Sequence, residues 1–389
     1  MNATPAHSPT TIASIEAIIV DLPTIRAHRL AMTTVNQQSL VIVKLRCSDG
    51  TLGIGEATSI GGLAYGEQSP ESTQLAIDAY LAPLLIGQDA GNVNAAMALL
   101  NRQVQGQSYA KSALETALLD ALGQRLGLPV HALLGGAVRR SMPVLWTLAS
   151  GDSGRDVEEA LGLMEARRHR VFKLKIGKGE PAANIAHVAH IKRALGAEVL
   201  ITVDVNQAWD EATAQGAIAA LEQAGVGLVE QPVPRRHRAA LARLAARFDV
   251  PIMADESING PEDALELAQE AAADVFALKI SKAGGLLNTL RTAAVGEAAG
   301  IGLYGGTLLE GSIGSIASAH AFAACPQLRW GTELFGPLLL KDDVVTQRPD
   351  YRDFELHLSD APGLGVSLDE DKLAHYRRDR QRTQVAVTA

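Results

Sequence analysis

In the middle and later parts of the chain, short apolar runs alternate regularly with amphipathic stretches. Residues 184–196 illustrate the amphipathic type, because Ile185, Val188, Ile191 and Leu195 share one face at helical spacing. The apolar runs have strand length and lie at residues 143–150, 171–177, 199–206, 226–233, 251–257, 275–281, 301–306 and 328–334. Eight strands with intervening helices predict a (β/α)-type barrel. A doubly wound sheet is the alternative, but no GxGxxG motif opens a helix after a strand here.

The first part of the chain has a different pattern. Residues 15–22 and 39–57 alternate apolar and polar positions as antiparallel strands do, and an Asp-Gly pair supplies a turn. A helical stretch over residues 76–124 follows and is ended by a Gly-Leu-Pro sequence. Strands followed by helices predict a small α+β domain. Beyond about residue 345 an α+β mixture returns, and we expect it to pack back on that domain.

Composition excludes several classes of partner. The 389 residues are 47% hydrophobic and 20% charged, which allows a large core and favours two domains. A net charge of −8 without a basic cluster argues against nucleic acid and anionic membranes, and no apolar run is long enough to span a membrane. Cys47 and Cys325 cannot build a disulfide framework. The first fourteen residues lack the regions of a secretion signal, so we expect a frayed tail on a cytoplasmic protein.

Charged and polar residues occupy the carboxyl ends of the expected barrel strands. These ends converge on the active site of a barrel, so the side chains are expected to face one another. The residues are Lys173, Lys175, Asp204, Asn206, Glu230, Asp255, Lys279 and Glu333. From Asp204 to Lys279 the charged positions recur about every 25 residues, which corresponds to one β/α unit per step.

Asp204, Glu230 and Asp255 are acids on consecutive strands. Each by itself has a simpler interpretation, as a helix N-cap or a solvated strand end. Together they would repel one another unless a cation lay between them. Three carboxylates with water form an all-oxygen ligand set that suits Mg²⁺ or Mn²⁺, whereas zinc recruits His or Cys, and none of the ten histidines falls at these strand ends. We therefore expect one divalent metal site.

Lys173 and Lys175 lie two residues apart on one strand and so point to the same face. Burying an ammonium group is costly unless something compensates. A divalent ion and a neighbouring ammonium both lower the pKa of a lysine. Lys175 is therefore expected to accept or donate a proton, while Lys173 and Lys279 supply positive charge for an anionic ligand. Lys279 by itself could also be a strand-end lysine that reaches solvent.

Several motifs resemble those of the enolase superfamily, in its muconate-lactonising subgroup. They are KLK at 173–175, Asp204 with Asn206, EQP at 230–232, Asp255-Glu256 and Lys279. Longer stretches also resemble enzymes of this subgroup, at residues 20–32, 60–70, 167–177, 298–314 and 331–340. The resemblance extends over nearly the whole chain, and the long matches are more specific than scattered acids.

The resemblance implies an α/β fold with an enolase-type (β/α)₇β barrel and an α+β capping domain. The cap would comprise residues 1–135, the barrel with its metal and catalytic site residues 136–344, and residues 345–389 would pack back on the cap. Segments 21–38 and 57–70 would be the cap loops that close over the substrate. The resemblance also implies an octamer of identical chains.

Carried over to this sequence, the resemblance makes Asp204, Glu230 and Asp255 the ligands of Mn²⁺ or Mg²⁺. It makes Lys175 the acid/base, Lys173 its neighbour, Lys279 the lysine on the opposite face, and Glu333 the acid at the end of the last strand. The residues expected to contact the substrate are Ile60, Tyr65, Asn206 and Phe335.

The implied reaction is the reversible lactonisation of cis,cis-muconate, a dicarboxylate from catechol ring cleavage, to muconolactone. One carboxylate would bind the metal and the other would add across the remote double bond. The resulting enediolate, stabilised by the metal, would be protonated by Lys175 at the α-carbon. Three lysines and the metal outweigh three acids, which leaves a positive pocket for a dianion.

Related activities are distinguished by particular residues. Mandelate-racemase types carry Lys-x-His where this chain has Lys173 and Lys175, and dipeptide epimerases carry Asp-x-Asp where it reads Gly331-Thr332-Glu333. o-Succinylbenzoate synthases share the lysines and are set aside on the longer matches. A chloromuconate cycloisomerase or another relative with the same catalytic groups stays open, as does a metal-containing barrel that binds without turnover.

Phe335 is the residue that helps to distinguish the chloromuconate cycloisomerase alternative. It lies two positions after Glu333, so on a continuing strand it would share the inward face of that residue. The resemblance associates a large aromatic residue here with the unchlorinated substrate, because a bulky ring limits the room for chlorine. The simpler interpretation is that Phe335 packs the barrel rim.

Overall fold

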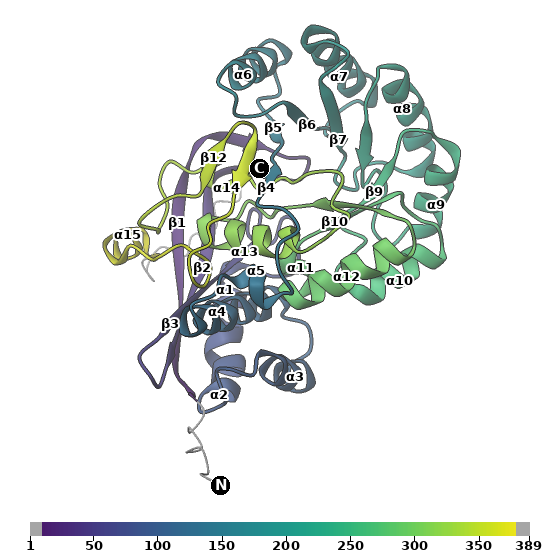
Figure 1. The fold of residues 1–389 in the computed structure, drawn as a ribbon. Helices are drawn as coiled ribbons and strands as arrows, with labels where there is room; N and C mark the ends of the chain where they lie inside the picture. Colours follow the sequence, from purple (N-terminus) through teal and green to yellow (C-terminus); the bar gives the residue numbers. More distant parts are fainter. Residues whose placement is uncertain (1–9, 379–389) are drawn as a thin grey trace.

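The computed structural model describes residues 10–378 and contains the predicted barrel (Figure 1). Seven parallel strands lie side by side in chain order. They are β5 (Trp146–Leu148), β6 (Val171–Lys175), β7 (Leu200–Asp204), β8 (Leu228–Glu230), β9 (Ile252–Ala254), β10 (Val275–Leu278) and β11 (Gly302–Gly305). The eighth expected strand is reduced to Thr332, which bridges in parallel to both Gly305 and Val144. This bridge closes the barrel between its first and last strands.

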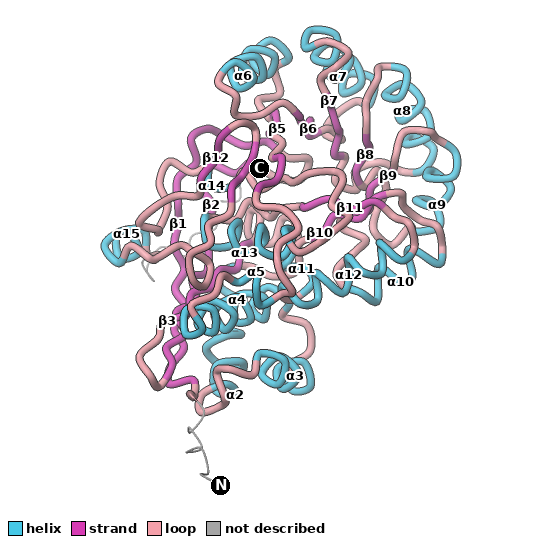
Figure 2. Tube along the Cα trace, viewed as in Figure 1, coloured by secondary structure: helices cyan, strands magenta, loops and turns pink. Residues whose placement is uncertain are grey.

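Helices follow the strands and cover the outside of the barrel (Figures 1 and 2). They are α6 (Ser153–Glu165), α7 (Pro181–Leu195), α8 (Glu211–Gln223), α9 (Arg238–Arg247), α10 (Pro261–Gln269), α11 (Ile280–Ala283), α12 (Leu286–Ala298) and α13 (Ser312–Ala323). Asp152 and Asp210 cap two of them by accepting from the backbone N–H of Arg155 and Thr213. All residues of α13 are buried, and α13 contacts strand β3 (Leu52–Thr58) of the cap. No helix within residues 10–378 is long and apolar enough to cross a membrane.

The cap is built on an antiparallel sheet of β1 (Ile12–Arg29), β2 (Thr34–Cys47) and β3 (Leu52–Thr58). Gly50, at a φ of +90°, forms the predicted turn between β2 and β3. The single helical stretch expected over residues 76–124 is wrong in detail. It is divided into α1 (Pro70–Ala76), the π-helix η1 (Ile77–Leu81), α2 (Ala82–Leu85), α3 (Val93–Gln103) and α4 (Ser108–Leu126).

Close packing of α4 on β3 depends on two glycines. A Cβ on Gly53 or Gly55 would lie 2.0 Å from a backbone carbonyl oxygen of α4. The helix can therefore lie directly on the strand, which fixes the start of the cap loop that follows β3.

The segment after the barrel runs back over the cap. It contains α14 (Gly336–Leu339), β12 (Asp350–Arg352), β13 (Glu355–His357) and α15 (Glu370–Tyr376); β13 also pairs with β4 (Ser141–Pro143), which follows α5 (Val130–Leu133). Near the end of the described chain, Arg378 donates to both carboxylate oxygens of Asp21 on β1. The domain boundaries at 135 and 344 stay predictions. The expected N-terminal tail falls mostly on residues 1–9, which lie outside the described residues.

Candidate active site

Strand register brings the predicted site residues together at the carboxyl ends of the strands. Lys175 on β6 is paired with Asp204 on β7, and Asp204 is paired with Glu230 on β8. Asp255 directly follows β9, the next strand. Lys173 and these three acids are at most 1% exposed. The order of the parallel strands therefore places a lysine pair beside a row of buried acids.

Each acid in this row faces an ammonium group. Lys173 Nζ lies 2.6 Å from Glu230 Oε2, and Lys175 Nζ lies 2.5 Å from Asp204 Oδ2. On the other side, Lys279 follows β10 and its Nζ lies 2.7 Å from Asp255 Oδ2. The lysines thus stand on two opposite sides of the acids, as the resemblance implied.

Glu333 and Lys282 complete the charged cluster. Glu333 follows the Thr332 bridge and accepts from Lys173 Nζ at 2.5 Å. Lys282 on α11 donates to the backbone carbonyl of Asp255, and its Nζ lies 3.1 Å from Asp255 Oδ1. Lys282 was not among the predicted site residues, because the turn of helix that follows β10 is too short to be recognised from its sequence pattern.

The charges of the protein itself set the pKa values in the site. Burial lowers the pKa of Lys175, but the carboxylate of Asp204 outweighs it, so the pKa lies above its ordinary value. Burial raises the pKa of Glu333, yet the Lys173 ammonium brings this pKa down to about 2. The lowered pKa expected for Lys175 is thus not produced by the protein groups themselves. It would require the additional positive charge of a metal ion.

Glu230 is the least compensated acid. Burial and the neighbouring charge of Asp204 raise the pKa of Glu230 well above its ordinary value, despite the ammonium of Lys173. Within residues 10–378, the buried oxygens Asn206 Oδ1 and Glu256 Oε2 have no hydrogen-bond partner, and Glu230 Oε2 has only the ion pair with Lys173. Buried oxygens without donors are costly, and a cation would satisfy them.

The predicted ligands Asp204, Glu230 and Asp255 have the ligand atoms that a divalent ion prefers, but their side chains are not positioned to bind one. Across residues 10–378, no three His, Cys, Asp or Glu side chains are arranged to hold a metal ion as they stand. The lysines account for this, because each predicted ligand is drawn to an ammonium group. The set is nevertheless all-oxygen, on three adjacent strand ends, as Mg²⁺ and Mn²⁺ require.

A small cavity lies above the acids and is closed by the cap. Its volume is about 20 Å³, and it is lined by His28, Leu30, Met32, Ile60, Tyr65, Lys175, Asn206, Asp255, Lys279, Thr307, Leu309 and Glu333. This space holds about one water molecule, far less than a six-carbon dicarboxylate. Side chains that line the cavity must therefore move to admit such a substrate.

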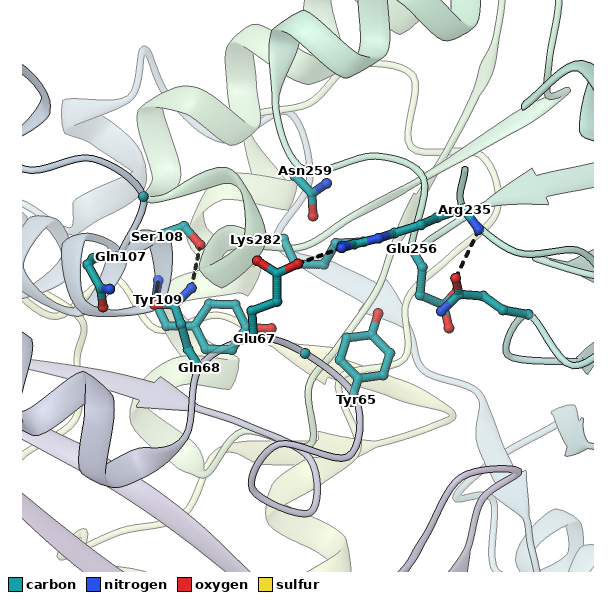
Figure 3. Close-up of a pocket in the computed structure, with 13 residues that line it drawn as sticks. Tyr65, Glu67, Gln68, Gln107, Ser108, Tyr109, Arg235, Glu256, Asn259 and Lys282 are labelled. Carbon is teal, nitrogen blue, oxygen red and sulfur yellow. Dashed lines mark hydrogen bonds and ion pairs between the residues drawn. The ribbon is translucent and has the colours of Figure 1, made fainter. Parts of the chain in front are cut away.

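Tyr65 connects this inner cavity with a larger outer one. Its hydroxyl donates to Asp255 Oδ2 at 2.8 Å and accepts from Lys279 Nζ at 3.0 Å. The outer cavity has a volume of about 600 Å³ and is also lined by Tyr65 (Figure 3). There Glu67 of the cap reaches Arg235 of the barrel at 2.5 Å (Figure 3). Tyr65 thus lies between the outer cavity and the acids.

Phe335 does not lie on a continuing strand, and that prediction is wrong. The bridge at Thr332 ends the extended backbone, and Phe335 caps the start of α14. The ring is fully buried and packs on Trp146 and His28, with ring centroids 5.0 and 6.0 Å apart. Because His28 lines the inner cavity and Phe335 does not, Phe335 can shape the cavity through His28.

The fold and the site together define a class of protein: a closed α/β barrel with a cap, whose acids lie between lysines at the strand ends. A model of the enolase C-terminal domain-like family matches residues 155–372. A model of the mandelate racemase/muconate lactonizing enzyme N-terminal domain matches residues 14–135. The chain belongs to the mandelate racemase/muconate lactonizing enzyme family of the enolase superfamily.

Particular relatives are similar over nearly the full chain. Muconate cycloisomerase 1 of Pseudomonas putida is 58% identical over 369 residues, which cover 94% of this chain and 98% of the relative. A chloromuconate cycloisomerase of Delftia acidovorans is 48% identical over 367 residues, 94% of this chain and 99% of the relative. The crystal structure of muconate lactonizing enzyme from Pseudomonas fluorescens complexed with muconolactone superposes with a TM-score of 0.95. It is 60% identical and covers 95% of this chain and 100% of that chain.

Proposed function

We propose that this protein is a muconate cycloisomerase that interconverts cis,cis-muconate and muconolactone. The observation that carries the proposal is the pair of lysine groups facing each other across three buried acids. Two separate carboxylates of a dianion need positive charge on more than one side, and Lys175 and Lys279 lie on opposite sides of the inner cavity. The 58% identity to a muconate cycloisomerase supports the same substrate.

Asp204, Glu230 and Asp255 would hold a divalent ion, which would supply positive charge to stabilise the negative charge that develops on the substrate carboxylate. The lysines of the chain do the rest. Lys279 attracts the dianion electrostatically, and Lys175 donates a proton to the α-carbon of the enediolate in the lactonising direction. In the reverse direction Lys175 accepts the proton from the same carbon. Lys173 stays charged because Glu230 and Glu333 hold its pKa well above the ordinary value in spite of burial.

The cap contributes to catalysis by excluding water from the inner cavity and by holding the substrate in a folded shape. The inner cavity lies under Tyr65 and Ile60 and is shielded from bulk water. In such a site the fixed lysine charges act more strongly than in water. A folded substrate also holds its attacking carboxylate close to the double bond, which makes the addition intramolecular.

The second candidate is a chloromuconate cycloisomerase with the same catalytic groups. The lower identity to that class, 48% against 58%, favours the unchlorinated substrate. The buried Phe335 behind His28 supports the same choice, since a smaller residue there would leave more room.

Several finer features belong to the same proposal. We infer that the metal is Mn²⁺ or Mg²⁺, that the enzyme acts in catechol degradation, and that it is cytoplasmic. We also infer a homo-octamer, which light scattering would detect; a monomer at all concentrations would contradict it. The test of the function itself is a progress curve on cis,cis-muconate with Mn²⁺ present. Formation of muconolactone is expected, and faster turnover of 3-chloromuconate would favour the second candidate.

A further inference from the structure

Gln231 directly follows the predicted metal ligand Glu230 and has a strained backbone. Its φ is +35°, in the left-handed region that favours glycine. Asn206 and Gln207, which follow β7, also have positive φ values of +46° and +68°. Non-glycine residues keep such conformations where the surrounding structure fixes them, and they cluster at functional sites. The backbone is therefore constrained just past two metal-ligand strands.

The side chain of Gln231 is fully buried and all of its hydrogen-bonding groups are used. Oε1 accepts from the backbone N–H of Asp255 at 3.0 Å and of Ser257 at 3.2 Å. Nε2 donates to the carbonyl of Val233 and to Ser257 Oγ, both at 2.9 Å. An amide is required for this combination of two acceptor and two donor contacts, because a carboxylate cannot donate and an apolar side chain can do neither.

The backbone of Gln231 also forms hydrogen bonds with both neighbouring strands. Its N–H donates to the carbonyl of Met253 on β9 at 2.9 Å, and its carbonyl accepts from the N–H of Gln207 at 2.8 Å. One residue thus joins the ends of β7, β8 and β9. These three strand ends carry the three predicted metal ligands.

We propose that Gln231 is a positioning residue that fixes Glu230 and Asp255 relative to each other for metal binding. The inference rests on the proposed metal site and deepens it. Gln231 does not touch the metal in this account. It acts by holding the backbone of Asp255 through Oε1 and the backbone after Glu230 through its own constrained conformation. Partners of this kind typically change metal affinity by about 10- to 100-fold when they are removed.

The test is calorimetric titration of the metal-free full-length protein with Mn²⁺ alone. Gln231→Met keeps the length of the side chain and removes its four hydrogen bonds, so we expect Mn²⁺ affinity to fall by about 10- to 100-fold. Ser257→Ala removes one of these partners with little change in volume and is the milder variant. It is expected to weaken Mn²⁺ binding in the same direction and by less, and it keeps the inference testable if Gln231→Met does not fold.

Gln38→Met is the matched control. Gln38 is another buried glutamine, 1% exposed, but its Nε2 donates to the backbone carbonyls of Ser59 and Leu308 and not to a predicted metal ligand. We expect this variant to lower the melting temperature while leaving the Mn²⁺ affinity unchanged. The inference is overturned if both Gln231→Met and Ser257→Ala bind Mn²⁺ like the wild type, or if Gln38→Met loses as much affinity as Gln231→Met. A wild-type protein that does not bind Mn²⁺ would instead overturn the metal site, and the inference with it.

Discussion

In the active site the buried acids face lysines, whereas at the junction of cap and barrel they face backbone amides. Asp255 lies between Lys279 and Lys282, and these ammonium groups hold its pKa well below the ordinary value although burial opposes them. Glu56 on β3 accepts instead from the N–H groups of Gly311 and Gly314 at the start of α13. Both solutions satisfy a buried carboxylate.

Acids paired with lysines and acids paired with backbone N–H groups differ in their protonation state. Burial and the nearby charge of Asp343 raise the pKa of Glu56 to about 8. Burial likewise raises the pKa of Asp120 to about 6, although it accepts from the N–H groups of Leu364 and Ile54. The junction acids are therefore partly protonated near neutral pH and connect distant segments. Asp255 and Glu333 stay charged instead, because the neighbouring lysines hold the pKa of each below its ordinary value.

Metal removal should have the largest effect and should affect the active site only. Treatment with EDTA is expected to abolish turnover of cis,cis-muconate, and added Mn²⁺ or Mg²⁺ should restore it. The far-UV circular dichroism should hardly change, because the junction acids use backbone donors. Full activity of exhaustively chelated enzyme would contradict the proposed role of Asp204, Glu230 and Asp255.

Replacing the proposed acid/base comes next. Lys175→Ala should lower kcat by about 10²- to 10⁴-fold, the usual contribution of a general acid–base group. Lys178→Ala, which removes an exposed lysine of the same segment, is the matched control and should keep wild-type kcat. If Lys175→Ala stayed within about tenfold of the wild type, another group such as Lys279 would have to carry the proton.

A smaller effect, on substrate preference, is expected from replacing Phe335, which packs behind His28 in the wall of the inner cavity. Phe335→Ile should reduce the preference for cis,cis-muconate over 3-chloromuconate, because the released volume lets His28 move away from the cavity. One small substituent in an apolar pocket is typically worth about 10- to 200-fold in specificity, which bounds the change. The measurement is kcat/KM for both substrates with both proteins. An unchanged ratio would mean that Phe335 only packs the rim.

The junction should show its own effect, in the pH dependence of stability and not in turnover. The folded protein keeps a proton on Glu56 up to about pH 8, whereas an unfolded glutamate releases it near pH 4.3. The unfolding free energy should therefore fall as pH rises between these values, by up to about 1.4 kcal/mol per pH unit from this group. Glu56→Gln should flatten that part of the curve, measured by urea unfolding at several pH values.

Glu262→Gln is the control for this experiment, since Glu262 is an exposed acid on the barrel surface. Its stability curve should run parallel to that of the wild type. A Glu56→Gln curve that also runs parallel would show that Glu56 is charged throughout, which would remove the contrast between the junction and the active site.

The grouping of lysines and acids in the active site could be predicted from the sequence, because it depends on regular local repeats. Alternation within each strand and the regular step between strands determine where side chains at strand ends point. The register observed between Lys175, Asp204 and Glu230 follows from those two periodicities. Residues whose roles depend on such local repeats could be named in advance.

Other features depend on contacts between distant segments and could not be predicted in this way. Glu56 occupies an ordinary polar position of an alternating strand, and it is buried because α13 begins against it. Gln231 falls within the strand expected at residues 226–233, and its contacts with Asp255 and Ser257 come from the end of the neighbouring strand. Phe335 was misplaced because the last strand stops at Thr332, where the chain closes the barrel. The surroundings of all three residues are determined by tertiary packing.

The most direct test of the central claim is to convert cis,cis-muconate in D₂O with Mn²⁺ and to analyse the product by proton NMR. We expect muconolactone with one deuteron at the methylene carbon next to the carboxylate, delivered by Lys175 after exchange with solvent and occupying a single position of that methylene. Absence of lactone, or lactone with deuterium distributed over both positions of the methylene, would contradict the central claim.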